Sequence, residues 1–174
     1  LYFKVAERSH ELRFPMSTGI AGHVASTGEL LNIPNAYEDS RFNQEVDRKT
    51  GYCTKSILAA PVRTPDGKII GVVQLINKLT GGVFDQDDIR VLTSVADLTA
   101  TALQNCKIHA RAISQGSFFH GCSAEDGTLA TSETIEARAL EVLKCSAARV
   151  YIADEEMEEL AYRGTQQRVP MSGN

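Results

Sequence analysis

The chain has 174 residues, of which 43% are hydrophobic and 23% are charged, a composition typical of globular material with one to one and a half domains. Its net charge of −4 argues against a nucleic-acid-binding protein, because a polyanion requires a concentrated basic surface and the basic residues here are scattered. No apolar run approaches the roughly 18 residues of a membrane span, and no secretory signal opens the chain. We therefore expect a cytoplasmic protein with no membrane span.

Cysteine spacing and catalytic motifs add further exclusions. Cys53, Cys106, Cys122 and Cys145 are far apart, with no Cys-x-x-Cys pair and no clustered His ligands, so we expect reduced thiols, no metal and no cofactor. Neither a Ser/His/Asp spacing nor a phosphate loop of the Walker type is present, and we expect this chain not to be an enzyme. It begins with Leu1 rather than Met, which indicates a fragment or a start that is not the native one.

The first fifth of the chain predicts two short strands and a helix. Residues 1–6 are rich in β-forming side chains, and a second short strand ends near Pro15, which is followed by Ser-Thr-Gly. From residue 19 to residue 27 the apolar residues lie on one face of a short helix, and Gly28 ends it.

A polar, turn-rich segment runs from residue 34 to residue 51, after a brief apolar stretch at residues 30–33. Long irregular segments inside compact domains are usually disordered or cover a binding site. The apolar and aromatic residues within it favour an ordered lid, which we place at residues 31–51.

Two apolar runs at residues 56–62 and 68–76 are separated by Arg-Thr-Pro-Asp-Gly. Pro65 presets a turn φ and Gly67 permits a positive φ, so the pattern predicts a β-hairpin in the centre of a sheet. Asp85 is a suitable N-cap for a helix that continues to residue 113. Two apolar stripes run along that helix, so it requires two partners: its own sheet and a second chain or domain.

The last third predicts a loop at residues 116–128, a helix at residues 133–147 capped by Ser132, and a strand at residues 149–154. Residues 167–172, QRVPMS, then repeat the pattern LRFPMS of residues 12–17. We therefore expect a first domain at residues 1–108, a connector at 109–131, and at 132–174 the start of a second copy. A segment that completes a fold is the alternative interpretation of residues 132–174.

One stretch carries a family resemblance. Residues 77–88, NKLTGGVFDQDD, resemble the Asn-Lys…Phe-x-x-x-Asp signature of cyclic-nucleotide-binding GAF domains, with Asn77, Lys78, Phe84 and Asp88 in the matching positions and Ile89 where the family has Glu. Residues 19–47 and 50–62 also look like this family, of the tandem type found in mammalian-type phosphodiesterases and cyanobacterial adenylyl cyclases. The resemblance implies an α+β GAF fold, with a central antiparallel sheet of about six strands, helices on one face and a ligand pocket under a lid on the other.

The resemblance also implies a ligand site. Backbone N–H groups of Ile20 and Ala21, at the start of a helix, would donate to the cyclic phosphate, and Gln74 would face the base. Lys78 and Asp88 would form a structural ion pair. The matching ligand positions are Ala6, Glu7, Ile20, Ala21, Asn43, Asp47, Thr50, Thr54 and Gln74.

The implied function is a regulatory module that binds cGMP or cAMP, orders its lid, and controls a downstream catalytic domain through a homodimer made by the 85–113 helix. The sequence leaves the choice of nucleotide open, since an amide such as Gln74 can donate or accept. A GAF domain that only dimerises is the alternative. A bilin, haem or thiol sensor is a third class, although no His or basic cluster accompanies Cys53.

Overall fold

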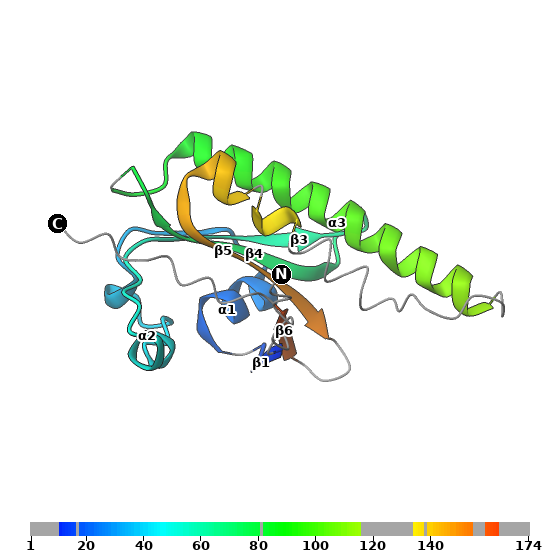
Figure 1. Ribbon diagram of the computed structural model, residues 1–174, viewed down its shortest axis with the longest axis horizontal. Helices are drawn as coiled ribbons and strands as arrows, with labels where there is room; N and C mark the ends of the chain where they lie inside the picture. Colours follow the sequence, from blue (N-terminus) through cyan, green and yellow to red (C-terminus); the bar gives the residue numbers. More distant parts are fainter. Residues whose placement is uncertain are drawn as a thin grey trace, which may run out of the picture.

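A computed structural model of the chain describes residues 11–16, 18–80, 82–115, 134–137, 139–154 and 159–163. One antiparallel sheet of six strands runs in the order β1-β6-β5-β4-β3-β2 (Figure 1). Together with its helices it forms the α+β GAF fold that the resemblance implied. The strands are β1 Glu11–Pro15, β2 Leu31–Ile33, β3 Ile57–Arg63, β4 Ile69–Lys78, β5 Cys145–Asp154 and β6 Glu159–Arg163.

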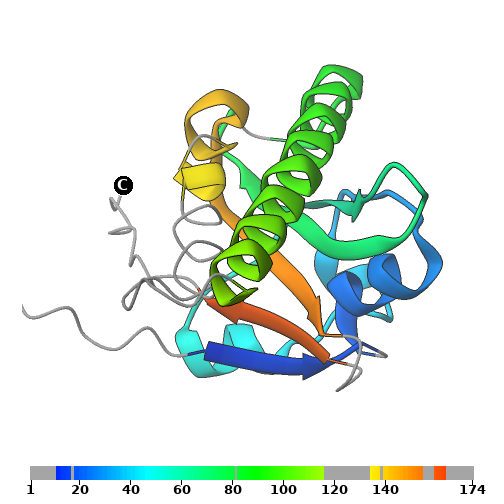
Figure 2. The ribbon, with the colours of Figure 1, turned by 90° about the vertical axis from the view of Figure 1, so that its right-hand side faces the viewer.

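Helices lie on both sides of the sheet. The 30-residue helix α3 (Gln86–Gln115) covers one face, beside the helical residues 134–137 and 139–143 (Figures 1 and 2). The opposite face carries α1 (Gly19–Thr27), together with the lid. Within the lid are the 3-10 helix η1 (Ala36–Glu38) and the short helix α2 (Glu45–Thr50).

Alternation of side chains along the central strands divides the core into two apolar clusters, one on each face. We call them the α3 cluster and the α1 cluster. The α3 cluster includes Leu58, Val73, Leu75, Phe84, Leu92, Leu103, Ala139, Leu143 and Val150. The α1 cluster includes Ile20, Val24, Ala36, Ile57, Ala59, Val72, Tyr151 and Leu160. The segment from 134 onward thus contributes to both clusters.

The predicted hairpin is confirmed, with boundaries shifted by one or two residues. β3 and β4 pair antiparallel from Ile57↔Ile76 to Arg63↔Ile69. Gly67 has φ of 88°, and the N–H of Thr64 donates to the carbonyl of Lys68 at 2.9 Å. Every residue of β4 from Ile70 to Ile76 is buried, which is what a central strand covered on both faces requires.

The two predicted helix signals also act as expected. Gly28 follows α1 with φ of 72°, and its N–H donates to the carbonyl of Val24. At the start of α3, Asp85 Oδ1 accepts from the N–H groups of Asp87 and Asp88. These two N–H groups lie in the first turn, so they have no carbonyl acceptor within the helix.

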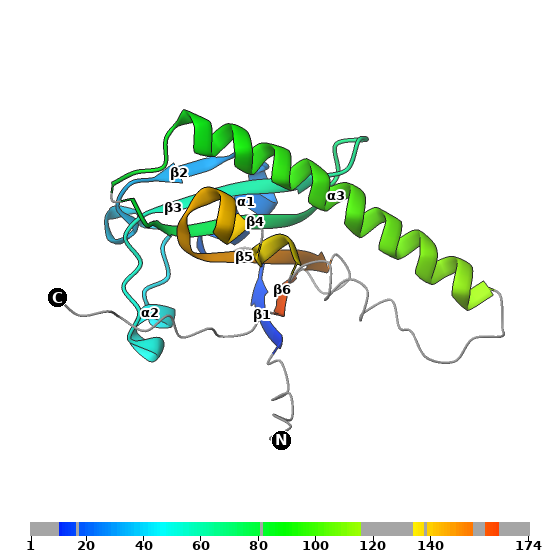
Figure 3. The ribbon, with the colours of Figure 1, turned by 45° about the horizontal axis from the view of Figure 1, so that its top comes forward.

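α3 presents one of its two apolar stripes to the sheet. Leu92, Ala96 and Leu103 on that stripe are almost fully buried, whereas Leu98 on the second stripe is 70% exposed. The C-terminal part of the helix continues past the edge of the sheet (Figures 1 and 3). No helix in the described part of the chain is long and apolar enough to cross a membrane.

The predicted helix at 133–147 is too long at its C-terminal end. Helical residues stop at Leu143, Lys144 adopts φ of 45°, and β5 begins at Cys145. The apolar pattern of the helix extends into Cys145 and Ala147, but pairing with β4 draws these residues into the sheet. β5 and β6 belong to the segment for which the sequence left two interpretations open, and the division at residues 108 and 131 stays a prediction. The strand predicted at residues 1–6 lies outside the described residues.

Candidate functional site

Gln74 lies in the middle of β4, on the face that carries α1. In the sheet register it stands between Ala59 of β3 and Arg149 of β5. Ala59 belongs to the α1 cluster, as does Val72, two residues before Gln74 on the same strand. Gln74 is 6% exposed. A buried Gln opposite a half-buried Arg in the strand register places polar side chains on a largely apolar face, which suits the recognition of a planar polar ligand.

The first turn of α1 lies on the same face. Gly19 has φ of 75°, Ile20 is buried and Ala21 is half-buried. Thr18 precedes the helix without capping it, because its hydroxyl donates back to the carbonyl of Pro15 instead. Gly22 allows α1 to pack closely against the preceding segment of the chain. A Cβ on Gly22 would lie 2.7 Å from the carbonyl oxygen of Met16.

The lid is more regular than the sequence suggested, since η1 and α2 interrupt the turn-rich segment. Asp39 and Arg41 form a forked ion pair, with Arg41 Nε and Nη2 donating at 2.9 and 2.6 Å. This guanidinium holds the pKa of Asp39 down at about 2. The rings of Tyr37 and Phe42 pack edge to face with centroids 5.4 Å apart. These contacts order the lid from within.

Asp47 connects the lid to the start of β3. Its Oδ2 accepts from the Tyr37 hydroxyl at 2.9 Å and from the Thr54 N–H at 2.7 Å, and its Oδ1 accepts from the Thr54 hydroxyl at 2.9 Å. Asp47 is 5% exposed and Thr54 is 3% exposed. The hydrogen bond to this carboxylate raises the pKa of Tyr37, because it holds the phenolic proton in place.

The remaining predicted ligand positions do not share this environment. Asn43 is exposed, and its Oδ1 accepts from the N–H of Glu45, so its side chain is engaged at the start of α2. Thr50 is the last residue of α2, and its side chain lies outside the described part. Ala6 and Glu7 also lie outside the described residues. Ile20, Ala21 and Gln74 thus lie on the α1 side of the sheet, and Asp47 and Thr54 bond to each other in and just after the lid.

Asn77 fixes the segment that leads from the lid to β3. Its Oδ1 accepts from the N–H groups of Lys55 and Ser56, and its Nδ2 donates to the carbonyl of Cys53 and to the hydroxyl of Tyr52. The residue adopts φ of 56°, a region that Asn occupies more readily than most side chains. One amide thus fastens the end of the lid to the end of β4.

Lys78 holds the start of α3 against the sheet. Its Nζ lies 2.6 Å from Asp88 Oδ2 and 2.7 Å from Asp85 Oδ2. Lys78 and Asp88 have side chains that are each 13% exposed. The ammonium lowers the pKa of Asp85 to about 2, and the carboxylates raise the pKa of Lys78. Phe84 is buried, and its carbonyl accepts from Asn32 Nδ2 at 2.8 Å. None of these four signature residues points to a role in ligand contact.

The sequence did not reveal three residues that the fold brings to this region. Arg149 lies beside Gln74 in the register, and the Ser146 hydroxyl lies 2.6 Å from that of Tyr52. Tyr37 bonds to Asp47 across the lid. Arg149 is the first residue of the strand predicted at 149–154, but only the β4–β5 register shows which residue it faces.

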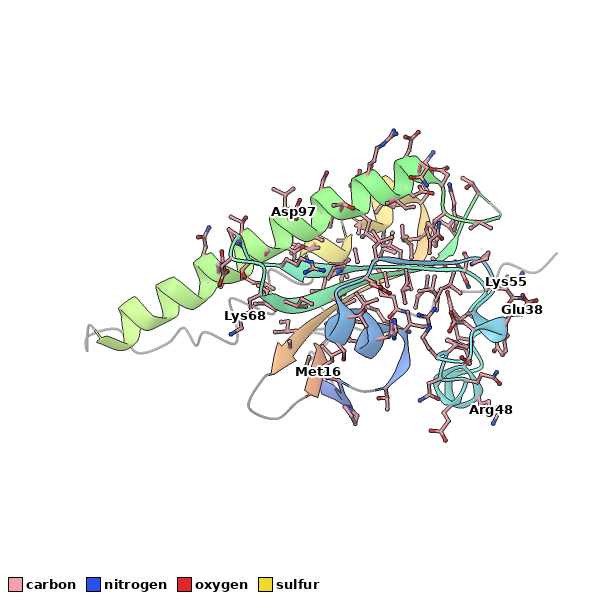
Figure 4. All side chains as sticks on the ribbon, turned by 180° about the vertical axis from the view of Figure 1, so that it is seen from behind. Met16, Glu38, Arg48, Lys55, Lys68 and Asp97 are labelled. Atoms are coloured by element: carbon pink, nitrogen blue, oxygen red, sulfur yellow. The ribbon has the colours of Figure 1, made fainter. Side chains whose placement is uncertain are left out.

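Two other candidate chemistries find no support in these contacts. Cys53 is an exposed free thiol. Among the residues that the structure describes, no group of three or more His, Cys, Asp or Glu side chains is placed to hold a metal ion. Figure 4 shows Glu38, Arg48 and Lys55 gathered at the lid end of the molecule, whereas Asp97 projects from α3 on the other side of the sheet.

Known proteins with similar sequences share only part of their length with this chain. It is 52% identical over 104 residues to the probable 3',5'-cyclic phosphodiesterase pde-5 of Caenorhabditis elegans, covering 60% of this chain and 14% of that protein. It is 45% identical over 103 residues to the dual 3',5'-cyclic-AMP and -GMP phosphodiesterase 11 of Drosophila melanogaster, covering 59% and 7%. The cGMP-specific 3',5'-cyclic phosphodiesterase of Drosophila mojavensis is 34% identical over 188 residues, covering 96% and 17%.

The chain therefore spans less than a fifth of each of these relatives. Residues 3–103, more than half of the chain, match the GAF domain family. The match includes α1, the lid, the β3–β4 hairpin and most of α3, which are the elements that build the site. This chain belongs to the GAF domain family.

Proposed function

We propose that this chain is a cyclic-nucleotide-binding regulatory GAF module of a cytoplasmic cyclic nucleotide phosphodiesterase. The observation that carries the proposal is that the first turn of α1 and Gln74 lie on the face of the sheet that also carries the lid with Asp47 (Figure 1). The names of the relatives support this proposal, because all three relatives described above are named as cyclic nucleotide phosphodiesterases.

Each group suits one part of a cyclic nucleotide. The positive end of the α1 dipole and its first N–H groups suit the singly charged phosphate. Gln74 has both a donor and an acceptor for the edge of a base. Apolar side chains of the α1 cluster, such as Ile20 and Ile33, would contact the purine and exclude water. The lid would close over the nucleotide, with Asp47 and Thr54 fixing its C-terminal end.

Titration calorimetry with cGMP and cAMP tests the proposal directly. We expect the protein to bind one of them, and Gln74→Ala to weaken binding about tenfold, the value of one lost hydrogen bond near 1.4 kcal/mol. Gln74→Glu, which keeps only acceptors, should change the preference between the two nucleotides. Ser94→Ala is the matched control, because Ser94 is exposed on α3, across the sheet. Equal affinities for wild type and Gln74→Ala would contradict this site.

The regulatory part of the proposal requires that binding change the lid and α3. Nucleotide should slow amide hydrogen exchange in residues 31–51 and, through the Lys78 contacts to Asp85 and Asp88, at the start of α3. In the full-length protein the same signal would reach a partner subunit and the downstream catalytic domain. Unchanged exchange in the lid of the saturated protein would show that the site does not work in this way.

A dimerisation module without a ligand is the second candidate. It is favoured by Leu98, which is 70% exposed on α3, and by the fact that Asp47 and Thr54 already satisfy each other. Analytical ultracentrifugation of wild type and Leu98→Asp would separate the candidates when combined with calorimetry. A dimer that Leu98→Asp abolishes, together with no heat from either nucleotide, would establish this second function.

A further inference from the structure

The lid divides into two halves that are attached to the domain in different ways. We call residues 36–42 the front half and residues 43–51 the rear half. In the front half, Ala36 is fully buried, and its N–H donates to the carbonyl of Lys55 at 2.7 Å. Ala36 and Phe42 both pack in the α1 cluster. The front half is therefore held to the domain by apolar burial and by a backbone hydrogen bond.

The rear half consists mainly of α2, which lies apart from the sheet (Figures 1 and 3). A helix of six residues is not stable in water by itself, so α2 depends on its contacts with the rest of the domain. Surface helices usually bury an apolar stripe. Among the α2 side chains that the structure describes, Glu45 and Arg48 are exposed, and the buried one is Asp47. In this part of α2, a carboxylate thus takes the place of an apolar contact.

Asp47 accepts three hydrogen bonds, which we call the Asp47 latch. One comes from the Tyr37 hydroxyl in the front half, and two come from the N–H and the hydroxyl of Thr54, beyond the rear half. The latch therefore joins α2 to the chain on both sides of the rear half. Asp47 is 5% exposed, so water has little access to replace these donors while α2 stays in place. Movement of α2 away from the domain requires all three bonds to break.

A turn that can change conformation joins α2 to the fixed segment that follows it. Gly51 has φ of 70°, and apart from its chain neighbours no heavy atom lies within 4 Å of the position that its Cβ would take. Glycine also adopts a wide range of backbone angles without a steric penalty. Directly after it, the amide of Asn77 bonds to four residues of the segment 52–56. α2 can therefore turn about Gly51 while the residues that lead to β3 stay in place.

We propose that the rear half of the lid opens as a unit about Gly51 when the Asp47 latch breaks, while the front half and β3 stay in place. The latch is a property of the chain itself, whereas its role as a gate for a nucleotide rests on the function proposed above. A site behind such a gate takes up ligand only during the fraction of time that the gate is open. The latch would therefore limit the rate of association.

Amide hydrogen exchange of the full chain without nucleotide, followed by NMR, tests the opening. Asp47→Asn keeps the size of the side chain and replaces one of its two acceptor oxygens with a donor group. The backbone N–H groups of Arg48 and Gly51 donate to carbonyls of the rear half. They should exchange about tenfold faster in this variant, the effect of one lost hydrogen bond. The N–H of Phe42, in the front half, should exchange at the wild-type rate.

Two further variants define the effect. Asp39→Asn makes the same chemical change in the front half, at the ion pair with Arg41, and should leave exchange in α2 at the wild-type rate. Thr54→Val removes one donor but keeps the carboxylate, so it should speed exchange in α2 by a smaller factor. Unchanged exchange in α2 for both latch variants would overturn the proposal. Equal acceleration in the two halves would overturn it as well, because the lid would then open in one piece.

Stopped-flow binding of fluorescent cGMP and cAMP analogues tests the gate. Asp47→Asn should raise the association rate constant by the same factor as amide exchange in α2, because both depend on the open fraction. Loss of a ligand contact alone would raise the dissociation rate constant and leave association unchanged, and that result would overturn the gate. A wild-type protein that binds neither nucleotide would refute the proposed function, and the exchange measurements would still decide whether the latch holds α2.

Discussion

Asp47 and Thr54 are joined by two hydrogen bonds, one from the Thr54 N–H and one from its hydroxyl, at 2.7 and 2.9 Å. They are seven positions apart in the chain, and together they tie α2 of the lid to the segment that precedes β3. The Tyr37 hydroxyl adds a third donor to the same carboxylate. Burying a carboxylate is costly unless its oxygens accept hydrogen bonds, so the fold depends on these three donors.

Asp47→Ala should therefore destabilise the fold by about 2–4 kcal/mol, because it leaves the donors of Thr54 and Tyr37 without their acceptor. Tyr37→Phe removes one of the three bonds from an exposed side chain and should cost much less. Urea unfolding followed by circular dichroism measures both values. A variant Asp47→Ala as stable as Tyr37→Phe would show that the Asp47 contacts contribute little to folding.

Asn77 combines a side-chain role with a backbone role, and two substitutions separate them. Asn77→Gly keeps the positive φ but loses the four side-chain bonds, and should cost about 2–3 kcal/mol. Asn77→Ala loses the same bonds and adds strain at φ of 56°, which should cost roughly 1 kcal/mol more. Thermal unfolding of the two variants gives the difference. Equal stabilities would mean that the backbone relaxes freely at this position.

Lys78 contacts two carboxylates, so replacing Lys78 alone should destabilise the fold more than replacing Lys78 and Asp88 together. Lys78→Met leaves Asp88, which is 13% exposed, without its cation and should lower the free energy of unfolding clearly. Lys78→Met/Asp88→Asn should recover part of that loss, because no unpaired charge remains. A double variant less stable than Lys78→Met, measured by urea unfolding, would contradict this account. Arg90→Ala is a control, since its ion pair with Asp87 is exposed on both sides.

The ion pair of Asp39 and Arg41 predicts an acid-dependent contribution to stability. The folded-state pKa of Asp39 is about 2, below its ordinary value of 3.8. Its contribution is therefore complete above about pH 4 and is lost as the pH falls toward 2. Arg41 is 35% exposed, so we expect about 1 kcal/mol or less. The difference in unfolding free energy between wild type and Asp39→Asn should shrink as the pH falls from 5 to 2. A difference that stays constant with pH would show that the ion pair of Asp39 and Arg41 does not stabilise the fold.

Local sequence determined most of the elements, since their signals act within a few residues. Gly28 and Asp85 mark helix boundaries through backbone groups of their own turns, and the Thr-Pro-Asp-Gly turn specifies the β3–β4 hairpin. The Asn-Lys…Phe-x-x-x-Asp signature indicated the family because its residues also lie close together in the sequence. The end of the helix at Leu143 was misplaced because its apolar pattern continues into β5, where pairing with β4 decides between helix and strand.

Only the tertiary structure decided what lies next to what. Arg149 stands beside Gln74, and Ser146 beside Tyr52, through the register of two strands about 75 residues apart in the chain. β5 pairs with β4 where Gly71 leaves space for the carbonyl oxygen of Tyr151. A single sequence does not contain these relations, because strand pairing depends on the free energy of burying both partners, and that depends on the whole fold.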